Sequence, residues 1–251
     1  MAKYLRKFET TADYESAKDS LILPNVSLCE DNNGVYYEPV PPPYQGFCKL
    51  TLDNGEVVEL EGSGELTRAM VSDQYEDTLV SAEIGTLCTS IGDSAFNGCI
   101  GLTSIDIPNN VTSIGGNAFY CCFSLTSIDI PDSVTSIGLG AFYQCTSLTN
   151  VTIGSGVTSI SGWAFGECDS LTSIEIPSGV TSIGNGAFAY CFNLTSITSL
   201  ATSAPTIISD TFQNVKTGGT LTVPSGSSGY DVWMQNANYY LGLYNWEKVE
   251  Q

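Results

Sequence analysis

Histidine does not occur in this chain of 251 residues. Its absence excludes the Ser-His-Asp and Cys-His nucleophilic systems and most zinc sites. The chain also has no glycine-rich phosphate loop followed by Lys and Ser or Thr. Catalysis would have to depend on carboxylates alone, so we expect that the protein is not an enzyme and that it holds neither a cofactor nor a metal ion.

Positive charge is scarce as well. Eight Lys and Arg stand against 27 Asp and Glu, which gives a formal net charge of −19, and residues 89–200 contain no Lys or Arg. Such a surface repels the phosphate backbone of nucleic acids and anionic lipid. We therefore expect no nucleic-acid partner and favour a partner with a basic surface.

Long apolar runs are missing too. Lys3, Arg6 and Lys7 near the N-terminus are not followed by an apolar stretch. The sequence therefore predicts neither a signal peptide nor a transmembrane span, and no insertion into a membrane is expected.

What the chain does contain is a repeat of 23 residues. Its five copies begin at Thr89, Thr112, Thr135, Thr158 and Thr181. The second copy reads TSIGGNAFYCCFSLTSIDIPDSV, with Leu and Ile at fixed offsets. A period between about 20 and 29 residues with this pattern is typical of a leucine-rich-repeat solenoid. We predict a mainly β, right-handed solenoid of parallel strands and short helical turns, with a cap at each end and a small α+β module at the N-terminus.

Each lap of the repeat has three predicted parts. The segment LTSIxI alternates apolar and polar residues, as a strand with one buried face does, and Pro108, Pro131 and Pro177 end it. VTSIG is a second, shorter extended piece, and AFxxC spaces Phe and Cys by one helical turn. One lap buries about six large apolar side chains, which cannot offset the entropy of ordering it. Laps must therefore stack, with strands about 4.8 Å apart.

Five cysteines recur at the repeat period. They are Cys99, Cys122, Cys145, Cys168 and Cys191. Equivalent side chains in successive laps point in parallel, so we predict a ladder of buried thiols instead of disulfides. Cys121 lies out of this register and is a candidate for exposure, while Cys29, Cys48 and Cys88 have no evident partner.

The chain divides into four predicted parts. They are a small N-terminal module with a Pro-rich linker over residues 1–45, a cap with a hairpin and a degenerate repeat over 46–88, five repeats over 89–200, and a degenerate repeat with an aromatic cap over 201–251. The hairpin spans residues 47–61 around Asp53-Asn54-Gly55. Aromatic residues gather after residue 230, and we expect them to cover the last coil.

The first 45 residues leave two interpretations open. Strands are predicted at residues 3–8, 25–29 and 35–37, with a short helix from Thr10 or Thr11 to about Ser20 and a stiff polyproline spacer over residues 39–43. The segment is either an assembly or anchoring module on a semi-rigid linker, or a flap that packs on the first coil.

The lap TSIGxxAFxxCxxLTSIxIPxxV resembles the BspA-type bacterial leucine-rich repeat. The ending TFxNV…GTLTVP…YxxW resembles the closing segment of that family, and the resemblance covers roughly residues 66–246. It implies a surface-exposed or secreted protein involved in adhesion and protein binding, without catalytic residues. Because the sequence shows no export signal, a virion or cytoplasmic location stays an alternative to the cell surface.

Two sets of residues are candidates for binding. The first forms polar columns on the long strand: Ser104, Asp106, Ser127, Asp129, Asn150, Thr152, Ser173 and Glu175, continued by Ser196 and Thr198. These columns are either a solvated face or an acidic recognition strip for a basic protein segment. A calcium ion needs six to eight oxygens in one pocket, and a flat column does not supply them.

The second set consists of aromatic residues at variable positions beside the AFxxC turn. They are Tyr120, Phe123, Tyr143, Trp163, Tyr190 and Phe192. Aromatic residues at regular spacing suit a partner surface or sugar stacking. They suit a second packing layer between the turns equally well.

These features predict a recognition module with adhesin-like binding of a protein or glycan. The alternative is a structural or assembly protein, such as a virion or surface-particle component, that is anchored and homo-oligomerises through residues 1–45. A third hypothesis is a carboxylate-only hydrolase built on Asp106 and Asp129, which needs two acidic groups about 5–10 Å apart over a cleft. A flat sheet gives no such cleft.

Overall fold

The computed structural model describes residues 5–8, 29–30, 36–39 and 43–251. The chain divides into two compact units, Met1–Pro43 and Tyr44–Gln251. In the first unit, β1 (Leu5–Phe8), β3 (Tyr36–Pro39) and β2 (Cys29–Glu30) form an antiparallel sheet in that order. Pro39 lies within β3, so the predicted polyproline spacer does not begin at this residue. The helix predicted from Thr10 or Thr11 to Ser20 lies outside the described residues.

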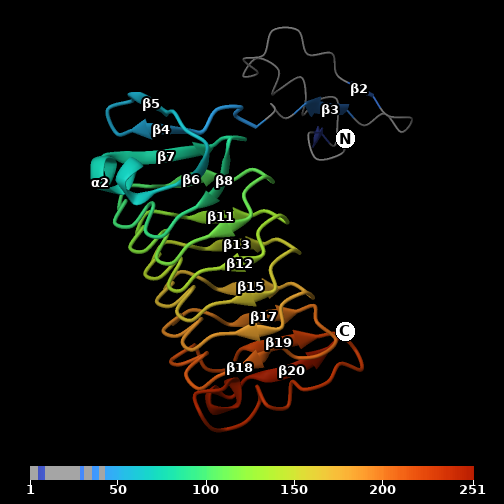
Figure 1. The fold of residues 1–251 in the computed structure, drawn as a ribbon. Coiled ribbons are helices and arrows are strands. Elements are labelled where there is room, and N and C mark those ends of the chain that lie inside the picture. The colour runs from blue at the N-terminus through green and yellow to red at the C-terminus, as the bar shows by residue number, and fades with distance from the viewer. Residues whose placement is uncertain (1–4, 9–28, 31–35, 40–42) are drawn as a thin grey trace. The chain divides into compact units, whose positions relative to one another are not determined.

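The second unit is a parallel β-solenoid (Figure 1). Its short strands are β6 (Gly64–Leu66), β8 (Cys88–Ile91), β10 (Ser113–Ile114), β12 (Ser136–Ile137), β14 (Ser159–Ile160), β16 (Ser182–Ile183) and β18 (Thr206–Ile207), and they form one seven-stranded sheet. Ser136 pairs with Ser159 and Ile137 with Ile160, so neighbouring strands are offset by one repeat. The predicted stacking of laps is confirmed.

The long strands lie on a second side of the coil. They are β7 (Leu79–Ile84), β9 (Ser104–Asp106), β11 (Ser127–Ile130), β13 (Asn150–Ile153), β15 (Ser173–Ile176), β17 (Ser196–Ser199), β19 (Thr220–Val223) and β20 (Glu247–Glu250). Within β11, Ile128 and Ile130 are buried while Ser127 and Asp129 are exposed, which is the predicted alternation. The strand ends at the residue before Pro131, because proline has no N–H to donate to the ladder.

The third side of each lap is a turn with a positive φ at both ends. In the third lap these residues are Gly140 and Gln144, each with φ of 60°. The N–H of Ala141 bonds back within its own lap, whereas the N–H of Phe142 donates to the carbonyl of Ala164 in the next lap at 2.8 Å. The sequence predicts a helical turn here. The left-handed residues stop a helix from continuing, and alternate N–H groups join neighbouring laps instead.

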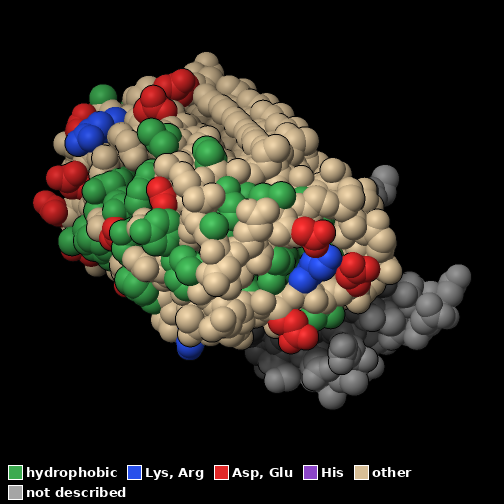
Figure 2. All heavy atoms as spheres, turned by 90° about the horizontal axis from the view of Figure 1, so that it is seen from below, with side chains coloured by type: hydrophobic (Ala, Val, Ile, Leu, Met, Phe, Trp, Pro, Cys, Tyr) green, Lys and Arg blue, Asp and Glu red, His purple; other side chains and the backbone are tan. Residues whose placement is uncertain are grey.

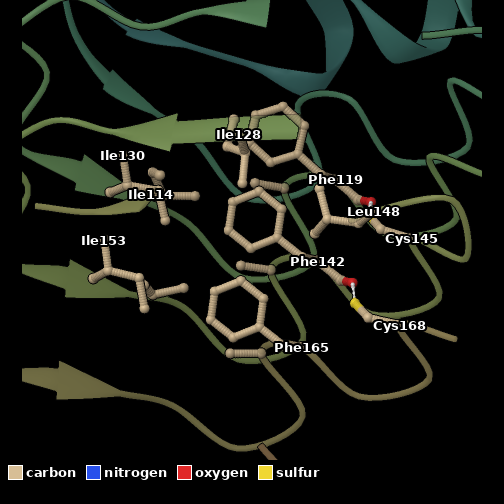
Figure 3. Packing of buried hydrophobic residues seen from close by; sticks show 14 of the residues in the cluster. Ile114, Phe119, Ile128, Ile130, Phe142, Cys145, Leu148, Ile153, Phe165 and Cys168 are labelled. Atoms are coloured by element: carbon tan, nitrogen blue, oxygen red, sulfur yellow. Dashed lines mark hydrogen bonds between the residues drawn. The ribbon is translucent and has the colours of Figure 1, made fainter. Parts of the chain in front are cut away.

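A file of phenylalanine rings fills the coil. Phe96, Phe119, Phe142, Phe165, Phe188 and Phe212 are each 0 % exposed. Successive rings stack with centroids 5.1–6.0 Å apart. Figure 3 shows three of them in line between the isoleucines of the strands and the cysteines of the turns. The stack follows from the repeat period, because the same apolar position recurs once per lap.

The cysteine ladder is also present. The five periodic thiols are fully buried and free. Each from Cys122 onward donates to a phenylalanine carbonyl in the preceding lap, as Cys168 Sγ does to Phe142 at 3.2 Å (Figure 3). Cys121 is half-buried, and its Sγ donates to Gln144 Oε1 at 3.1 Å. Cys48 and Cys88 are buried free thiols.

The N-terminal cap is the predicted hairpin with an addition that the sequence does not reveal. β4 (Cys48–Leu52) and β5 (Val57–Leu60) pair antiparallel, and β4 also pairs with β7. Two short helices, η3 (Arg68–Met70) and α2 (Ser72–Tyr75), follow β6. Ser72 Oγ donates to the carbonyl of Asn97, which ties α2 to the first turn of the repeat.

The C-terminal aromatic residues cover the last coil, as predicted. Trp233 packs on Phe212 with ring centroids 5.3 Å apart, and Tyr230, Trp233 and Trp246 are buried. β20 adds a final parallel strand beside β19, after η4 (Leu241–Tyr244). Seen from this end, hydrophobic side chains gather on the surface with acidic ones around them (Figure 2). The cap residues Val232, Tyr239 and Leu243 are exposed.

Tyr230 offers a test of how tightly the cap is fixed. Its hydroxyl donates to the carbonyl of Ala201 at 2.8 Å and lies 2.6 Å from Ser199 Oγ, and all three groups are buried. Tyr230→Phe should lower the free energy of unfolding by about 1–3 kcal/mol, because two buried polar groups lose a partner. Urea denaturation measures the change. Adding Ser199→Ala to that variant should recover part of the loss, and an unchanged midpoint for Tyr230→Phe would contradict the prediction.

Candidate functional site

The predicted polar columns lie on the outward face of the long strands. The eight residues from Ser104 to Glu175 are exposed, and Ser196 and Thr198 are half-buried. The parallel register places Ser127 beside Asn150 and Asp129 beside Thr152. The columns therefore form a flat, hydroxyl-rich face in which Asp106 and Asp129 follow one another and Glu175 pairs with Thr198.

The acidic column extends further toward the N-terminus than the sequence analysis recognised. Glu83 on β7 pairs in register with Asp106, and Lys49 Nζ on β4 lies 2.8 Å from Glu83 Oε2. Loss of water around the Asp106 carboxyl raises its pKa, and the charges of Glu83 and Asp129 raise this pKa further. Glu83 stands 23 residues before Asp106, so the repeat period was the signal that identifies it.

A shallow pocket of about 300 Å³ lies at this end of the polar face. Its polar lining is Lys49, Thr51, Ser81, Glu83, Ser104 and Asp106. Asp129 is not part of the lining, so the carboxylate pair of the hydrolase hypothesis does not face a common cleft. Over the described ranges, no group of three or more Cys, Asp or Glu side chains is placed to hold a metal ion. In the same ranges, no helix combines the length and apolar content that crossing a bilayer requires.

The predicted aromatic residues come together on the turn side of the coil. Tyr120 stacks on Tyr143 at 5.4 Å, Tyr143 meets Trp163 edge to face at 5.7 Å, and Trp163 lies parallel to Tyr190 at 6.3 Å. Phe192 extends the series from Tyr190 at 6.0 Å. We call these five residues the aromatic strip. Phe123 is exposed and is not among these ring pairs.

The strip crosses four laps, and Trp163 enters it from a lap position with left-handed backbone. Trp163 has φ of 57° and occupies the same lap position as Asn117, Gly140 and Gly186. A Cβ at Gly186 would lie 2.8, 2.9 and 3.1 Å from three atoms of the Trp163 indole, so the ring face covers that glycine. A larger residue at position 186 would displace the indole.

On the other side of Trp163, a second shallow pocket of about 300 Å³ lies over Gly140. It is lined by Asn117, Tyr120, Leu139, Gly140, Tyr143 and Trp163. Leu139 is 59 % exposed, and Asn117 Oδ1 approaches the position that a Cβ of Gly140 would take. Nothing in the sequence marks Asn117, Leu139 and Gly140 as pocket residues, because the pocket depends on the absent side chain at residue 140.

Hydrogen bonds fix the far side of this pocket. The Tyr143 hydroxyl donates to Glu167 Oε1, and Gln144 Nε2 donates to Glu167 Oε2 at 2.8 Å. Burial raises the pKa of Tyr143, and its hydrogen bond to the Glu167 carboxylate raises this pKa further. The phenol therefore stays neutral and its ring is held in one orientation.

Comparison with known proteins identifies the repeat. The family described as BspA type leucine rich repeat region matches in six copies, over residues 74–195 and 140–230. A leucine-rich repeat protein from Bacteroides ovatus has a solved structure that is 27% identical, with a TM-score of 0.50 over 81% of this chain. No curated protein matches the chain.

A leucine rich cell surface protein from Faecalibacterium prausnitzii is 23% identical, with a TM-score of 0.46, and the match covers 79% of this chain and 69% of that one. The present chain spans 52% of the length of the Bacteroides ovatus protein. The fold is therefore shared with the Bacteroides ovatus protein, which is longer than this chain.

Proposed function

The chain belongs to the BspA-type leucine-rich repeat family, and from this premise we propose that it is a non-enzymatic recognition module that binds a protein or glycan partner. The observation that carries the proposal is the aromatic strip. Aromatic side chains with polar tips combine a large contact area with a hydrogen-bonding group, which is why they dominate binding surfaces. An adhesin-like role is the form of binding that fits the family.

The strip is not needed to fill the core. The phenylalanine file already occupies the interior, and Tyr120, Tyr143, Trp163 and Tyr190 are each half-buried outside it. Phe192 is 53 % exposed. These rings pack on one another and also present area to solvent, so the packing and binding interpretations of the sequence are both compatible with their position. Their continuity across laps favours binding, since an extended partner could contact several rings at once.

The polar face supplies the second component of the proposal. Asp106, Asp129 and Glu175 are exposed, and the net charge of −19 extends their influence. Exposed charges mainly accelerate the encounter with an oppositely charged partner and add little affinity at physiological salt. For a protein partner, we propose that this face favours a basic surface while the aromatic strip provides most of the binding energy.

Binding should be lost when the strip is removed. The full chain can be screened against panels of purified cell-surface proteins and of immobilised glycans. For any partner found, the double variant Trp163→Ala, Tyr190→Ala should weaken binding by at least about tenfold, because each exposed ring is an anchor. Surface plasmon resonance measures the dissociation constant and both rate constants.

A charge variant is the matched control for this experiment. Asp106→Asn, Asp129→Asn and Glu175→Gln together should slow association at low salt and leave the dissociation rate nearly unchanged. Partners that bind the strip variant as tightly as the native chain would contradict the proposal. The assembly role of residues 1–45, with a homo-oligomer formed through them, stays a prediction because most of that segment lies outside the described residues.

A further inference from the structure

We propose that the pocket over Gly140 binds one pyranose ring of a neutral glycan, which stacks on Trp163 and hydrogen-bonds to the amide of Asn117. This inference rests on the proposed recognition function and names its ligand class. In this pocket aromatic rings, a polar amide and open volume occur together.

The geometry of Trp163 provides the stacking platform. One face of the indole covers Gly186 and lies near the ring of Tyr190. Trp163 also lines the pocket over Gly140, so part of its indole is accessible from that space. Tyr143 meets the indole at 81° and forms an adjoining wall. A flat aromatic floor with a perpendicular wall suits a ring-shaped ligand that has one apolar face.

The backbone position of Trp163 explains how its indole reaches this space. A left-handed φ recurs at this position in all five repeats, in Ser94 and Asn117 as well as in Gly140 and Gly186, and Trp163 adopts it with φ of 57°. The conformation is therefore a property of the turn, and the lap of Trp163 differs in having a glycine at the same position on either side. The two glycines are what make the site possible, one by accepting the indole and the other by leaving the pocket open.

The polar groups of the pocket match hydroxyl groups. The Asn117 amide provides both a donor and an acceptor, so it can bond a sugar hydroxyl in either sense. The Glu167 carboxylate already accepts hydrogen bonds from Tyr143 and Gln144. It therefore fixes the Tyr143 wall of the pocket and does not bond to the ligand. A volume of about 300 Å³ lies at the lower end of small-molecule sites and accommodates one sugar ring.

Charge decides which glycans fit. No Lys or Arg occurs between residues 89 and 200, and Glu167 lies beside the pocket, so sialylated, sulfated and uronic-acid glycans are repelled. A cationic side chain is the competing ligand. None of the six residues that line the pocket carries a carboxylate, however, and the Glu167 carboxylate already accepts from Tyr143 and Gln144, so an ammonium group would find no free ion-pair partner there.

The test uses the fluorescence of the full chain. Of its three tryptophans, Trp233 and Trp246 are 1% and 5% exposed in the cap, so Trp163 alone reports on ligands from solution. Neutral oligosaccharides of glucose, galactose, mannose and N-acetylglucosamine are titrated separately. We expect a saturable change with at least one series, confirmed by calorimetry, and no response to a sialylated counterpart.

Gly140→Asn is the decisive variant. Asn117 holds φ of 52° at the same position one lap earlier, so asparagine at residue 140 is compatible with the left-handed backbone. Its Cβ would lie 2.6 Å from Asn117 Oδ1, so the Asn117 side chain must shift, and the new side chain fills the pocket. This variant should weaken glycan binding by at least about tenfold and keep the Trp163 signal. Phe123→Ala removes an exposed aromatic residue that does not line the pocket and should change nothing.

Several outcomes would overturn the inference. They are the absence of saturable binding by all four neutral series up to about 10 mM, equal binding of sialylated glycan, and unchanged binding by Gly140→Asn. A lysine-rich peptide that binds, and is lost with Trp163→Ala, would overturn the glycan assignment while leaving the recognition function intact. If the recognition function were wrong as well, the partners found in the screen would bind the variant Trp163→Ala, Tyr190→Ala as tightly as the native chain.

Discussion

Replacement of Phe142 by alanine should lower the free energy of unfolding by about 3–5 kcal/mol, which is the usual cost of emptying a fully buried phenylalanine site. Phe142 is 0 % exposed and stacks on Phe119 at 5.1 Å and on Phe165 at 5.2 Å. The cavity therefore removes contacts on both sides at once. Collapse around the cavity is restricted, because the Phe142 N–H is bonded to Ala164 and its carbonyl accepts from Cys168.

The position of Phe142 in the stack makes the effect spread along the coil. Each lap contacts only its neighbours, so the stability of the array depends on every interface between laps. Hydrogen exchange should show weaker protection in the laps of Phe119 and Phe165 as well. Urea denaturation followed by circular dichroism measures the total loss. Phe123→Ala, a change of the same chemistry at a site that is 41 % exposed, should alter stability by less than about 0.5 kcal/mol.

A loss below about 1 kcal/mol for Phe142→Ala would mean that the rings are not the interface between laps. The phenylalanine file would then be a consequence of strand pairing and not a cause of stacking. Strand pairing between laps is brief, since Ser136 and Ile137 make up the whole of β12 and the long strand β11 has only four residues. We therefore expect the rings to dominate.

The fold was predictable from the sequence to the extent that it repeats. A residue such as Phe142 recurs every 23 positions, and identical positions can be buried together only if the laps are stacked in register. The same reasoning gave the buried cysteines and the ends of the long strands at proline. It could not give η3 and α2, because residues 68–75 lack the AFxxC pattern that the repeats have at this turn.

The side-chain hydrogen bonds between laps could also not be predicted from the sequence. Thr112 Oγ1 donates to the Thr89 carbonyl at 3.1 Å, and Thr158 Oγ1 does the same to Thr135 at 3.2 Å. The exposed threonine at the start of each lap therefore helps to join it to the previous lap. The sequence pattern shows only that this position is polar. It does not distinguish a threonine hydroxyl that bonds to solvent from one that bonds to the previous lap.

The sequence predicted the aromatic residues of the candidate site but not the pocket between them. Its aromatic residues stand out because the other laps have different residues there, but Gly140 carries no chemistry of its own. Its importance follows from the left-handed backbone at φ of 60° and from the position of Trp163 one lap later. Sites formed by a missing side chain require coordinates, because the sequence cannot tell an open volume from one that a neighbour fills.

Alkaline pH should unfold the solenoid through its buried thiols. Burial raises the pKa of Cys48, of Cys99 and of Cys191 to about 12. Burial also holds the pKa of Cys122, Cys145 and Cys168 well above the ordinary value. In the unfolded chain a thiol has a pKa of about 8.5. The thiols therefore contribute their full stability below about pH 8.5, and the contribution is lost as the pH rises toward 12.

The size of the loss follows from proton linkage. Between the two pKa values the unfolded chain binds one proton fewer per thiol, so each thiol lowers the free energy of unfolding by about 1.4 kcal/mol per pH unit. Cys48, Cys99 and Cys191 together account for about 4 kcal/mol per unit, and the deeper thiols add to it. A domain of ordinary stability cannot withstand much more than two such units.

Comparing urea denaturation at about pH 8 and about pH 10, in the presence of a reductant, tests this expectation. Tyrosines have an ordinary pKa near 10, so staying at or below that pH keeps the cysteines dominant. The variant Cys122→Ala, Cys145→Ala should be less stable at pH 8, because buried sulfur atoms are removed, yet its stability should fall less steeply with pH, by about 2.7 kcal/mol per unit. Equal slopes for the native chain and the variant would show that these thiols ionise freely in the folded state, which is incompatible with a closed coil.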